Sequence, residues 1–231
     1  MKEEKTMIKI KNLKRYYNTG ILVKALNGVS FEIKKGEFIM IMGPSGSGKT
    51  TMLRILGLLD KPTKGEYTIN NLDVVHLPEK ERNYYRLTQL GYVFQDYALI
   101  NEMTASENVH ILSLMEGKSE KEAHLTAKEA LEKVGLGKML DRVPNQLSGG
   151  EKQRVAIARA IAKKPKILFA DEPCANLDTQ TSGQILEVLS ALNKEFGQTI
   201  VMVTHEEWHT KHASRVIQLK DGFIVSDKKL R

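Results

Sequence analysis

Eight consecutive residues, Gly43 to Thr50, have the types and spacing of a loop that holds the phosphates of a nucleotide. The pattern needs glycine at positions 43 and 48, where the backbone turns tightly and points its N–H groups inward at phosphate oxygens. Lys49 is expected to contact the β- and γ-phosphates, and the Thr50 hydroxyl to coordinate Mg²⁺. The residues predicted to bind ATP here are Gly43, Pro44, Ser45, Gly46, Ser47, Gly48, Lys49, Thr50 and Thr51.

Two acidic residues, Asp171 and Glu172, follow an apolar run at residues 167–170. A phosphate loop needs a carboxylate on Mg²⁺, usually at the end of a neighbouring buried strand, and Asp171 is in that position. Glu172 could then polarise the water that attacks the γ-phosphate, which is general-base chemistry. Without the loop, the same pair would be interpreted as the charged N-terminus of a helix.

The elements on both sides of the phosphate loop are those that it requires. Residues 38–42 form a continuous apolar run, typical of a strand buried on both faces, and lead directly into Gly43. Beyond Thr50, apolar residues recur at helical spacing from Met52 to Leu59, which predicts a helix ending near residues 60–62. The order of strand, loop and helix makes a chance glycine-serine loop the weaker interpretation.

The rest of the chain predicts an α/β fold. Strands that alternate with helices favour a mostly parallel sheet, here within one domain over residues 1–231. The stretch from about Thr104 to Lys164 is mostly helix-forming, with breaks at Gly117, at residues 135–137 and at Pro144, and is interpreted as an inserted helical lobe. Further strands are expected around residues 8–13, 29–33, 166–170, 199–203 and 215–225, with a helix over 180–196.

Composition sets limits on the partners and the compartment. The 231 residues are 41% hydrophobic and 27% charged, and no apolar run reaches the roughly 20 residues that span a bilayer. The N-terminus lacks the pattern of a secretory signal, so a cytoplasmic location is expected. The net charge of +7 is spread along the chain and interleaved with acids, which argues against nucleic acid as a partner. The single cysteine, Cys174, cannot form a disulfide within the chain and says little about the compartment.

A second motif, near the C-terminus, matches the pattern of a zinc site. His205-Glu206-Glu207-Trp208-His209 satisfies H-E-x-x-H, the pattern in which two histidines on one helix face bind zinc. His205 directly follows the strand expected at residues 199–203, so the two histidines are not expected to share a helix. The zinc interpretation is therefore disfavoured.

Taken with Leu147-Ser148-Gly149-Gly150-Glu151, the phosphate loop and the acidic pair resemble the ATPase subunits of ATP-binding cassette (ABC) transporters. The match in motif order extends over essentially the whole chain. The resemblance implies a mostly parallel core sheet, an antiparallel β subdomain near the N-terminus and an inserted helical subdomain at about residues 96–164. It also implies ATP hydrolysis.

The resemblance assigns further roles that spacing alone does not. Tyr17 is expected to stack on adenine, with Tyr16 as an adjacent competitor. Gln95 would touch Mg²⁺ and the attacking water, and His205 would contact the γ-phosphate. The segment Asn176-Leu177-Asp178 resembles a loop that crosses a dimer interface, which makes Asp178 a predicted nucleotide-site residue. Cys174 and Ala175 depart from the Thr-Gly that close relatives often carry.

The resemblance also implies partners. Ser148, Gly149, Gly150 and Glu151 would complete the site of a second copy of the chain, so that two chains enclose two ATP molecules. Transmembrane permease subunits would receive the motion, with residues 97–104 as their contact, and would hold the chain at the inner face of the membrane. Within the family, the motifs look most like the macrolide-export and lipoprotein-release branch. An ATP-gated sensor or mechanical transmitter that transports nothing is the alternative.

Overall fold

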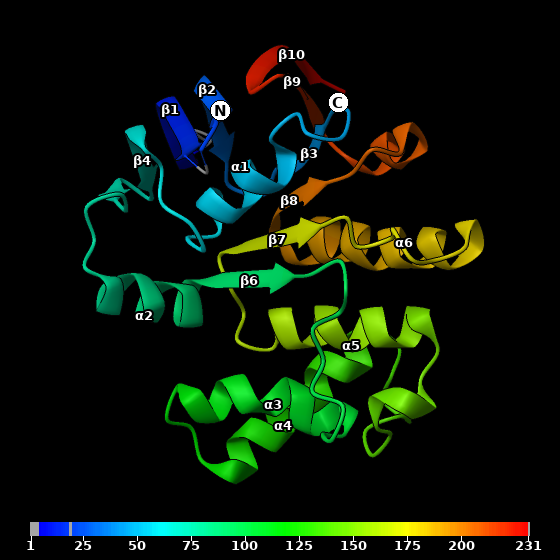
Figure 1. The fold of residues 1–231 in the computed structure, drawn as a ribbon. Helices are drawn as coiled ribbons and strands as arrows, with labels where there is room; N and C mark the ends of the chain where they lie inside the picture. Colours follow the sequence, from blue (N-terminus) through cyan, green and yellow to red (C-terminus); the bar gives the residue numbers. More distant parts are fainter. Residues whose placement is uncertain (1–4, 19, 231) are drawn as a thin grey trace. The chain divides into compact units, whose positions relative to one another are not determined.

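The computed structural model describes residues 5–18 and 20–230. Contacts within the chain divide it into two compact units. The first comprises Met1–Tyr84 with Leu192–Arg231, and the second comprises Tyr85–Ala191. The first unit is built mostly of strands, and the second mostly of helices (Figure 1).

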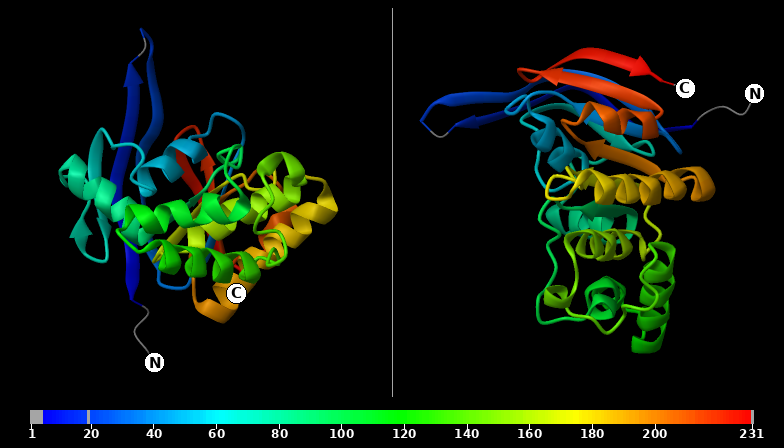
Figure 2. Two further views of the ribbon diagram at one scale, coloured as in Figure 1. Left: turned by 90° about the horizontal axis from the view of Figure 1, so that it is seen from below. Right: turned by 90° about the vertical axis from the view of Figure 1, so that its right-hand side faces the viewer.

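The first unit begins with an antiparallel sheet in the order β2-β1-β4-β5. Its two long strands pair along most of their length and form one extended ribbon (Figure 2). The early strands predicted from alternating apolar residues are therefore confirmed, and they belong to an antiparallel sheet. The bounds are β1 Thr6–Asn18, β2 Leu22–Lys34, β4 Lys64–Ile69 and β5 Leu72–Asp73.

The first unit also holds strands in the order β10-β9-β3-β8. The central strand β3 is parallel to both β8 and β9, and all five of its residues are buried, as its continuous apolar run predicts. The hairpin of β9 and β10 is antiparallel and turns at Asp221 and Gly222. The bounds are β3 Phe38–Met42, β8 Thr199–Val203, β9 Arg215–Lys220 and β10 Phe223–Lys229.

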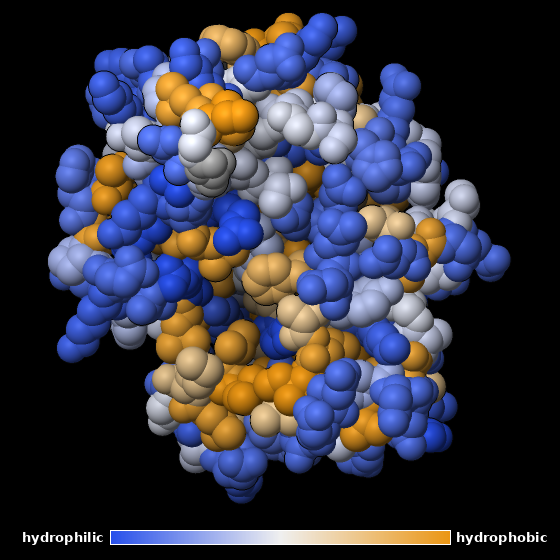
Figure 3. Space-filling view, viewed as in Figure 1, coloured by the Kyte–Doolittle hydropathy of each residue, from blue (hydrophilic) through white to orange (hydrophobic). Residues whose placement is uncertain are grey.

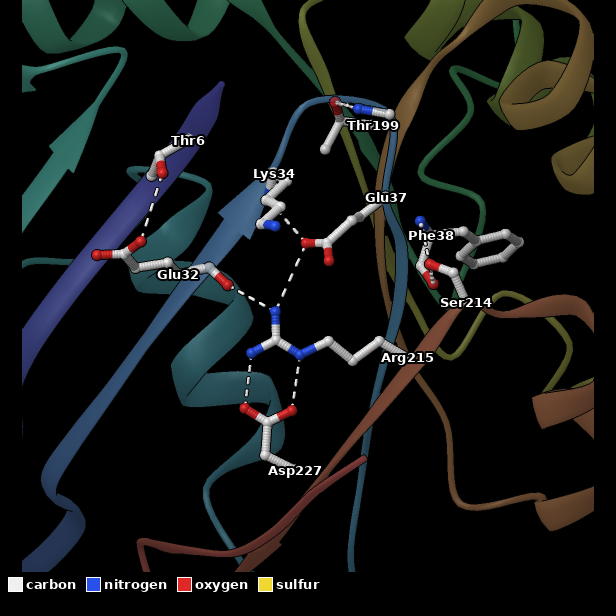
Figure 4. Close-up of polar contacts among 10 residues, drawn as sticks. Thr6, Glu32, Lys34, Glu37, Phe38, Thr199, Ser214, Arg215 and Asp227 are labelled. Atoms are coloured by element: carbon white, nitrogen blue, oxygen red, sulfur yellow. Dashed lines mark hydrogen bonds and ion pairs between the residues drawn. The ribbon is translucent and has the colours of Figure 1, made fainter. Parts of the chain in front are cut away.

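An arginine joins the strands of this unit (Figure 4). Arg215 on β9 forms a bidentate ion pair with Asp227 on β10, with both N···O distances 2.6 Å. Its remaining terminal nitrogen donates to the Glu32 carbonyl on β2 at 2.7 Å and lies 3.5 Å from the Glu37 carboxylate. One side chain therefore ties β2 of the antiparallel sheet to the strands beside β3.

Helix α1, Lys49–Leu56, ends earlier than the apolar spacing predicts. Leu58 adopts a left-handed conformation, with φ of 58°, and its N–H donates to the Ile55 carbonyl. The Leu59 N–H donates to the Arg54 carbonyl at 2.8 Å, which completes a Schellman arrangement. The terminal carbonyls are thus satisfied, and Leu58 and Leu59 lie beyond the helix.

The second unit contains the parallel pair β6 Leu90–Val93 and β7 Ile167–Asp171. Its helices α3, α4 and α5 each start with a capping box, in which a serine or threonine and a glutamate three residues later satisfy each other's backbone N–H. The helical region predicted over residues 104–164 is confirmed, with breaks at Gly117, Gly135 and Pro144. The bounds are α3 Ala105–Met115, α4 Glu120–Lys133, the 3₁₀ turn η1 Pro144–Gln146 and α5 Gly149–Ile161.

Two helices cross the boundary between the units. Helix α6, Thr179–Phe196, covers nearly the stretch that its apolar spacing predicts. Helix α2, Glu79–Gln89, is not evident from the pattern, because Arg82 is its one fully buried residue among those described and no apolar stripe marks it. No helix in the described ranges is both long enough and apolar enough to cross a bilayer.

Candidate functional site

The phosphate loop lies between the last residue of β3 and the first of α1. Gly43, Gly46 and Gly48 have φ values of 149°, 78° and 100°, conformations that favour glycine. A Cβ at Gly43 would lie 2.1 Å from the Leu219 carbonyl oxygen, and one at Gly48 would lie 2.3 Å from that of Ala25. Both positions therefore require glycine for two reasons, the backbone conformation and the approach of another strand.

The interior of this loop fits a polyanion. Lys49 is buried, and its Nζ donates to the carbonyls of Gly43 and Pro44 at 2.8 and 3.0 Å. Ser47 Oγ is also buried and has no hydrogen-bond partner among the described residues. The first turn of α1 carries no acidic residue, so the positive end of the helix is not neutralised there. Thr50 and Thr51 lie in this first turn.

His205 emerges at the same sheet edge as the phosphate loop. Strands β3 and β8 are parallel, and the Thr204 N–H donates to the Ile41 carbonyl at 3.2 Å, so both strands end together. The His205 side chain is about half exposed, with 54% of its surface accessible, and its Nε2 lies 3.4 Å from a Glu206 carboxylate oxygen. This edge can therefore present an imidazole beside the loop.

The helix geometry that a zinc site needs is not formed by the H-E-x-x-H pattern. His205 lies before the 3₁₀ helix η2, Glu207–His212, so the two histidines do not lie on one α-helix. His209 lies inside η2 and is buried, with its Nδ1 2.7 Å from Thr204 Oγ1. Among the described residues, no cluster of three or more histidine, cysteine or acidic side chains could hold a metal ion. The expectation that His205 lies at a strand end is confirmed.

The buried imidazole of His209 gives the first unit a pH dependence. Burial is the main cause that lowers its pKa to about 4; Glu206 opposes this shift, and His212, His205 and Lys211 contribute to it. Because the folded pKa lies below the unfolded value, the stabilisation is full above about pH 6.5 and is lost as the pH falls toward 4. We expect this group to contribute at most about 3 kcal/mol to that loss of unfolding free energy.

Urea titrations at pH 7, 6, 5 and 4 measure this contribution. The variant His209→Phe should lose less unfolding free energy than the native chain between pH 6.5 and 4. Equal losses in the two proteins would contradict a buried, neutral His209.

The two candidate adenine-stacking tyrosines make different contacts. The Tyr17 hydroxyl donates to Asp60 Oδ2 at 2.9 Å, and the Arg15 guanidinium lies 4.4 Å from the Tyr17 ring centroid. Arg15 also pairs with Asp60, at 2.9 Å. The Tyr16 hydroxyl instead donates to Asn27 Oδ1 at 2.9 Å.

The pairing of β1 with β2 relates Tyr17 to the phosphate loop. Arg15 lies opposite Leu26, and a Leu26 methyl carbon lies 3.1 Å from the position of a Cβ at Gly48. Directly opposite residues of an antiparallel pair project to the same face. Tyr17 shares Asp60 with Arg15, whose partner on β2 is this Leu26 beside Gly48.

In the second unit, Gln95 and the acidic pair share a sheet edge. Strands β6 and β7 are parallel, with Val93 opposite Ala170, so the residues that follow both strands emerge together. The Asn176 side-chain amide lies 3.5 Å from the Gln95 carbonyl. Glu172 has a φ of 41°, a conformation uncommon for a residue with a side chain and often found at functional sites.

The serine-glycine motif, Leu147 to Glu151, leads into helix α5, with Ser148 as its N-cap. The Ser148 hydroxyl accepts from the Glu151 N–H and donates to the Glu151 carboxylate at 2.8 Å. The Ser148 backbone N–H also donates to this carboxylate at 2.8 Å, and this bond, together with the one from the hydroxyl, lowers the pKa of Glu151. Gly149 and Gly150 are confined, because a Cβ would lie 3.2 Å from the Tyr97 hydroxyl at the first and 2.3 Å from Thr181 at the second.

Asp178 caps the helix that follows the acidic pair. Its carboxylate accepts from the Thr181 N–H at 2.9 Å and from the Thr181 hydroxyl at 2.6 Å. Gly150 also meets Thr181, so the start of α5 and the start of α6 lie side by side. The residues of the predicted site are thus divided between the two units. The first holds the phosphate loop, Tyr17 and His205, and the second holds Gln95, Ser148, Gly149, Gly150, Glu151, Asp171, Glu172 and Asp178.

Arg159 on α5 is a residue that sequence reasoning missed. Its guanidinium donates to the carbonyls of Tyr97 and Ala98, two non-glycine residues with φ values of 63° and 48°. The bonds hold an unusual turn two residues after Gln95. Sequence offered no signal, because an arginine in an Ala- and Ile-rich helix is ordinarily solvated.

Comparisons with known proteins agree with these motifs. A family model described as ABC transporter matches residues 26–175. An uncharacterized ABC transporter ATP-binding protein of Methanocaldococcus jannaschii is 47% identical over 95% of this chain and 98% of its own length. The macrolide export ATP-binding/permease protein MacB of Chlorobium luteolum is 48% identical over 96% of this chain, which spans only 33% of that protein.

The fold has a solved counterpart. The ATP-binding cassette MJ0796 of Methanocaldococcus jannaschii, solved as a dimer in a post-hydrolysis state bound to ADP and Pi, superimposes with a TM-score of 0.90. It is 44% identical, and the match covers 97% of this chain and 99% of that one. The predicted fold class is confirmed. The chain belongs to the ABC transporter family and is one of its ATP-binding proteins.

Proposed function

We propose that this chain hydrolyses ATP as the energy-supplying subunit of a membrane exporter or extractor. The observation that carries the proposal is the phosphate loop, whose glycine backbone, buried Ser47 hydroxyl and inward Lys49 suit a triphosphate. Tyr17 would stack on the adenine. The chain would act at the cytoplasmic face of the membrane, held there by partner transmembrane subunits.

Each functional residue has one task in this proposal. Lys49 binds the β- and γ-phosphates, and His205 contacts the γ-phosphate. Glu172 orients and deprotonates the attacking water. Thr50, Gln95 and Asp171 would hold Mg²⁺, an ion that neutralises charge on the phosphates when bound.

A second copy of the chain would complete each site. Ser148, Gly149, Gly150 and Glu151 form a capped helix N-terminus, which attracts an anion through its backbone N–H groups. This end would meet the γ-phosphate held by the partner's phosphate loop, with Asp178 near the interface. The dimeric, ADP- and Pi-bound structure of MJ0796 supports this arrangement. Hydrolysis would remove the bridging phosphate and open the dimer.

Apolar surface in the second unit supports a membrane partner. Ile100 and Met115 are exposed, and Figure 3 shows apolar side chains gathered over the part of the chain that contains α3. Residues 97–104 would contact the permease. The MacB relatives are macrolide export ATP-binding/permease proteins, which favours an exporter.

Complementation between two inactive variants tests the composite site. Lys49→Ala disables the phosphate loop, and Ser148→Phe places a bulky ring at the exposed start of α5. A mixed dimer regains one complete site, from the native loop of one chain and the native α5 of the other. We expect ATP hydrolysis by the mixture above the sum of the separate variants.

The control is a mixture of Lys49→Ala with Glu172→Gln. Glu172 belongs to the same half of the composite site as the phosphate loop, so no mixed dimer gains a complete site. This mixture should stay inactive. Thermal unfolding checks that Ser148→Phe folds, since loss of the cap costs about 1 kcal/mol. Hydrolysis by the native chain as a monomer, at a rate per chain independent of protein concentration, would contradict the proposal.

A further inference from the structure

His209 is a buried histidine that the proposed ATPase chemistry does not use. Only 2% of its surface is exposed, and its Nδ1 lies 2.7 Å from Thr204 Oγ1. Its ring packs edge-on against Trp208, with the centroids 4.3 Å apart. A buried polar ring with a short, specific hydrogen bond is a costly choice for packing alone, since an apolar residue would fill the same space.

The hydroxyl that His209 contacts also organises the backbone around His205. Thr204 Oγ1 accepts from the Glu206 N–H at 3.1 Å, which closes a turn with His205 at its centre. The His209 N–H donates to the Glu206 carbonyl at 3.3 Å. His209 therefore contacts the residues on both sides of His205, through its ring on one side and its backbone on the other.

The turn is fixed to the sheet as well. Thr204 is itself buried, and its N–H donates to the Ile41 carbonyl on β3, two residues before the phosphate loop. The hydroxyl thus has a fixed position relative to the strand that feeds the loop. The contact between His209 and that hydroxyl therefore helps to hold the His205 backbone in place relative to the loop. The His205 side chain stays about half exposed.

We propose that His209 is a positioning residue for His205, acting through the Thr204 hydroxyl to hold the turn in the conformation that reaches the γ-phosphate. The inference rests on the proposed function of His205. It assigns to the second histidine of the H-E-x-x-H pattern a role in nucleotide discrimination. Because ADP has no γ-phosphate, the role concerns the preference for a triphosphate over ADP and leaves ADP affinity itself unchanged.

Calorimetry with ADP and with a non-hydrolysable ATP analogue measures this preference without turnover. His209→Phe keeps a ring beside Trp208 but removes the hydrogen bond, and Thr204→Val replaces the hydroxyl by a methyl group. We expect each to reduce the preference for the triphosphate roughly tenfold, about the value of one hydrogen bond. Together they should have no more effect than either alone, because both break the same bond.

Rescue and background variants separate positioning from general damage. His209→Asn places a polar atom near the position of Nδ1 and should restore most of the preference. On a His205→Ala background, His209→Phe should have no further effect. Thermal unfolding checks each variant, and Thr204→Val carries the test if His209→Phe fails to fold.

Two results would overturn the inference. The first is an unchanged preference in both His209→Phe and Thr204→Val while His205→Ala lowers it; the second is an effect of His209→Phe that adds fully to that of His205→Ala. An unchanged preference in His205→Ala would instead overturn the γ-phosphate role of His205, together with the inference built on it. The phosphate-loop test with Lys49→Ala is independent of all these outcomes.

Discussion

Replacing Glu172 with glutamine should leave ATP binding intact, reduce turnover at least about 100-fold and cause a nucleotide-dependent dimer to accumulate. Glutamine matches glutamate in shape but cannot accept the proton of the attacking water. Since both residues carry a Cβ, the positive φ of 41° at this position is equally strained in the two proteins. The difference between them therefore isolates the chemistry of the carboxylate.

Three measurements check this prediction. Phosphate release gives turnover, calorimetry gives ATP affinity, and light scattering with ATP or ADP gives the oligomeric state. Glu187→Gln, the same change at an exposed position on α6, serves as the matched control and should behave as the native chain. Unchanged turnover in Glu172→Gln would remove Glu172 from the role of general base.

Replacing Lys49 with alanine should abolish tight ATP binding, with an affinity loss of about 100-fold or more. The ammonium group is buried within the loop, where it now contacts the Gly43 and Pro44 carbonyls. In the proposed function it would exchange these neutral acceptors for phosphate oxygens, which form stronger, charge-assisted bonds. Alanine removes that charge, so that only the N-terminus of α1 and the backbone N–H groups would remain to bind the phosphates.

Calorimetry with ATP measures the loss, and Lys80→Ala on the exposed face of α2 is the matched control. The folded state should persist in both variants, as judged by thermal unfolding. Near-normal ATP affinity in a folded Lys49→Ala protein would refute the assignment of the loop, and with it the proposed function.

Local pattern determined much of the fold. The five buried residues of β3, the three capping boxes at Thr104, Ser119 and Ser148, and the helix breaks at Gly117 and Gly135 all depend on residues within a few positions of one another. Such features follow from backbone sterics and side-chain period, which a single sequence displays directly. Helix α2 was missed because its buried residue is an arginine and it shows no apolar stripe.

The phosphate loop shows how sequence and tertiary structure divide the explanation. Sequence alone identified Gly43 to Thr50 as a phosphate-binding loop, because the required glycines, lysine and threonine are adjacent. Only the tertiary structure revealed that the Leu219 carbonyl lies close to Gly43 and the Ala25 carbonyl close to Gly48. At both positions a side chain would clash with a neighbouring strand. These contacts depend on strand order and register, which no local pattern encodes.

The same division applies to the residues around the site. Sequence singled out His205 and His209 as a pair with zinc-site spacing, whereas the structure separates them into a turn and a buried position on η2. It also joins Arg159 to the carbonyls of Tyr97 and Ala98, about 60 positions away in the chain. The sequence determines which residues have side chains that can do chemistry. Packing between distant segments determines which of these residues meet, and this packing is established only when the whole core forms.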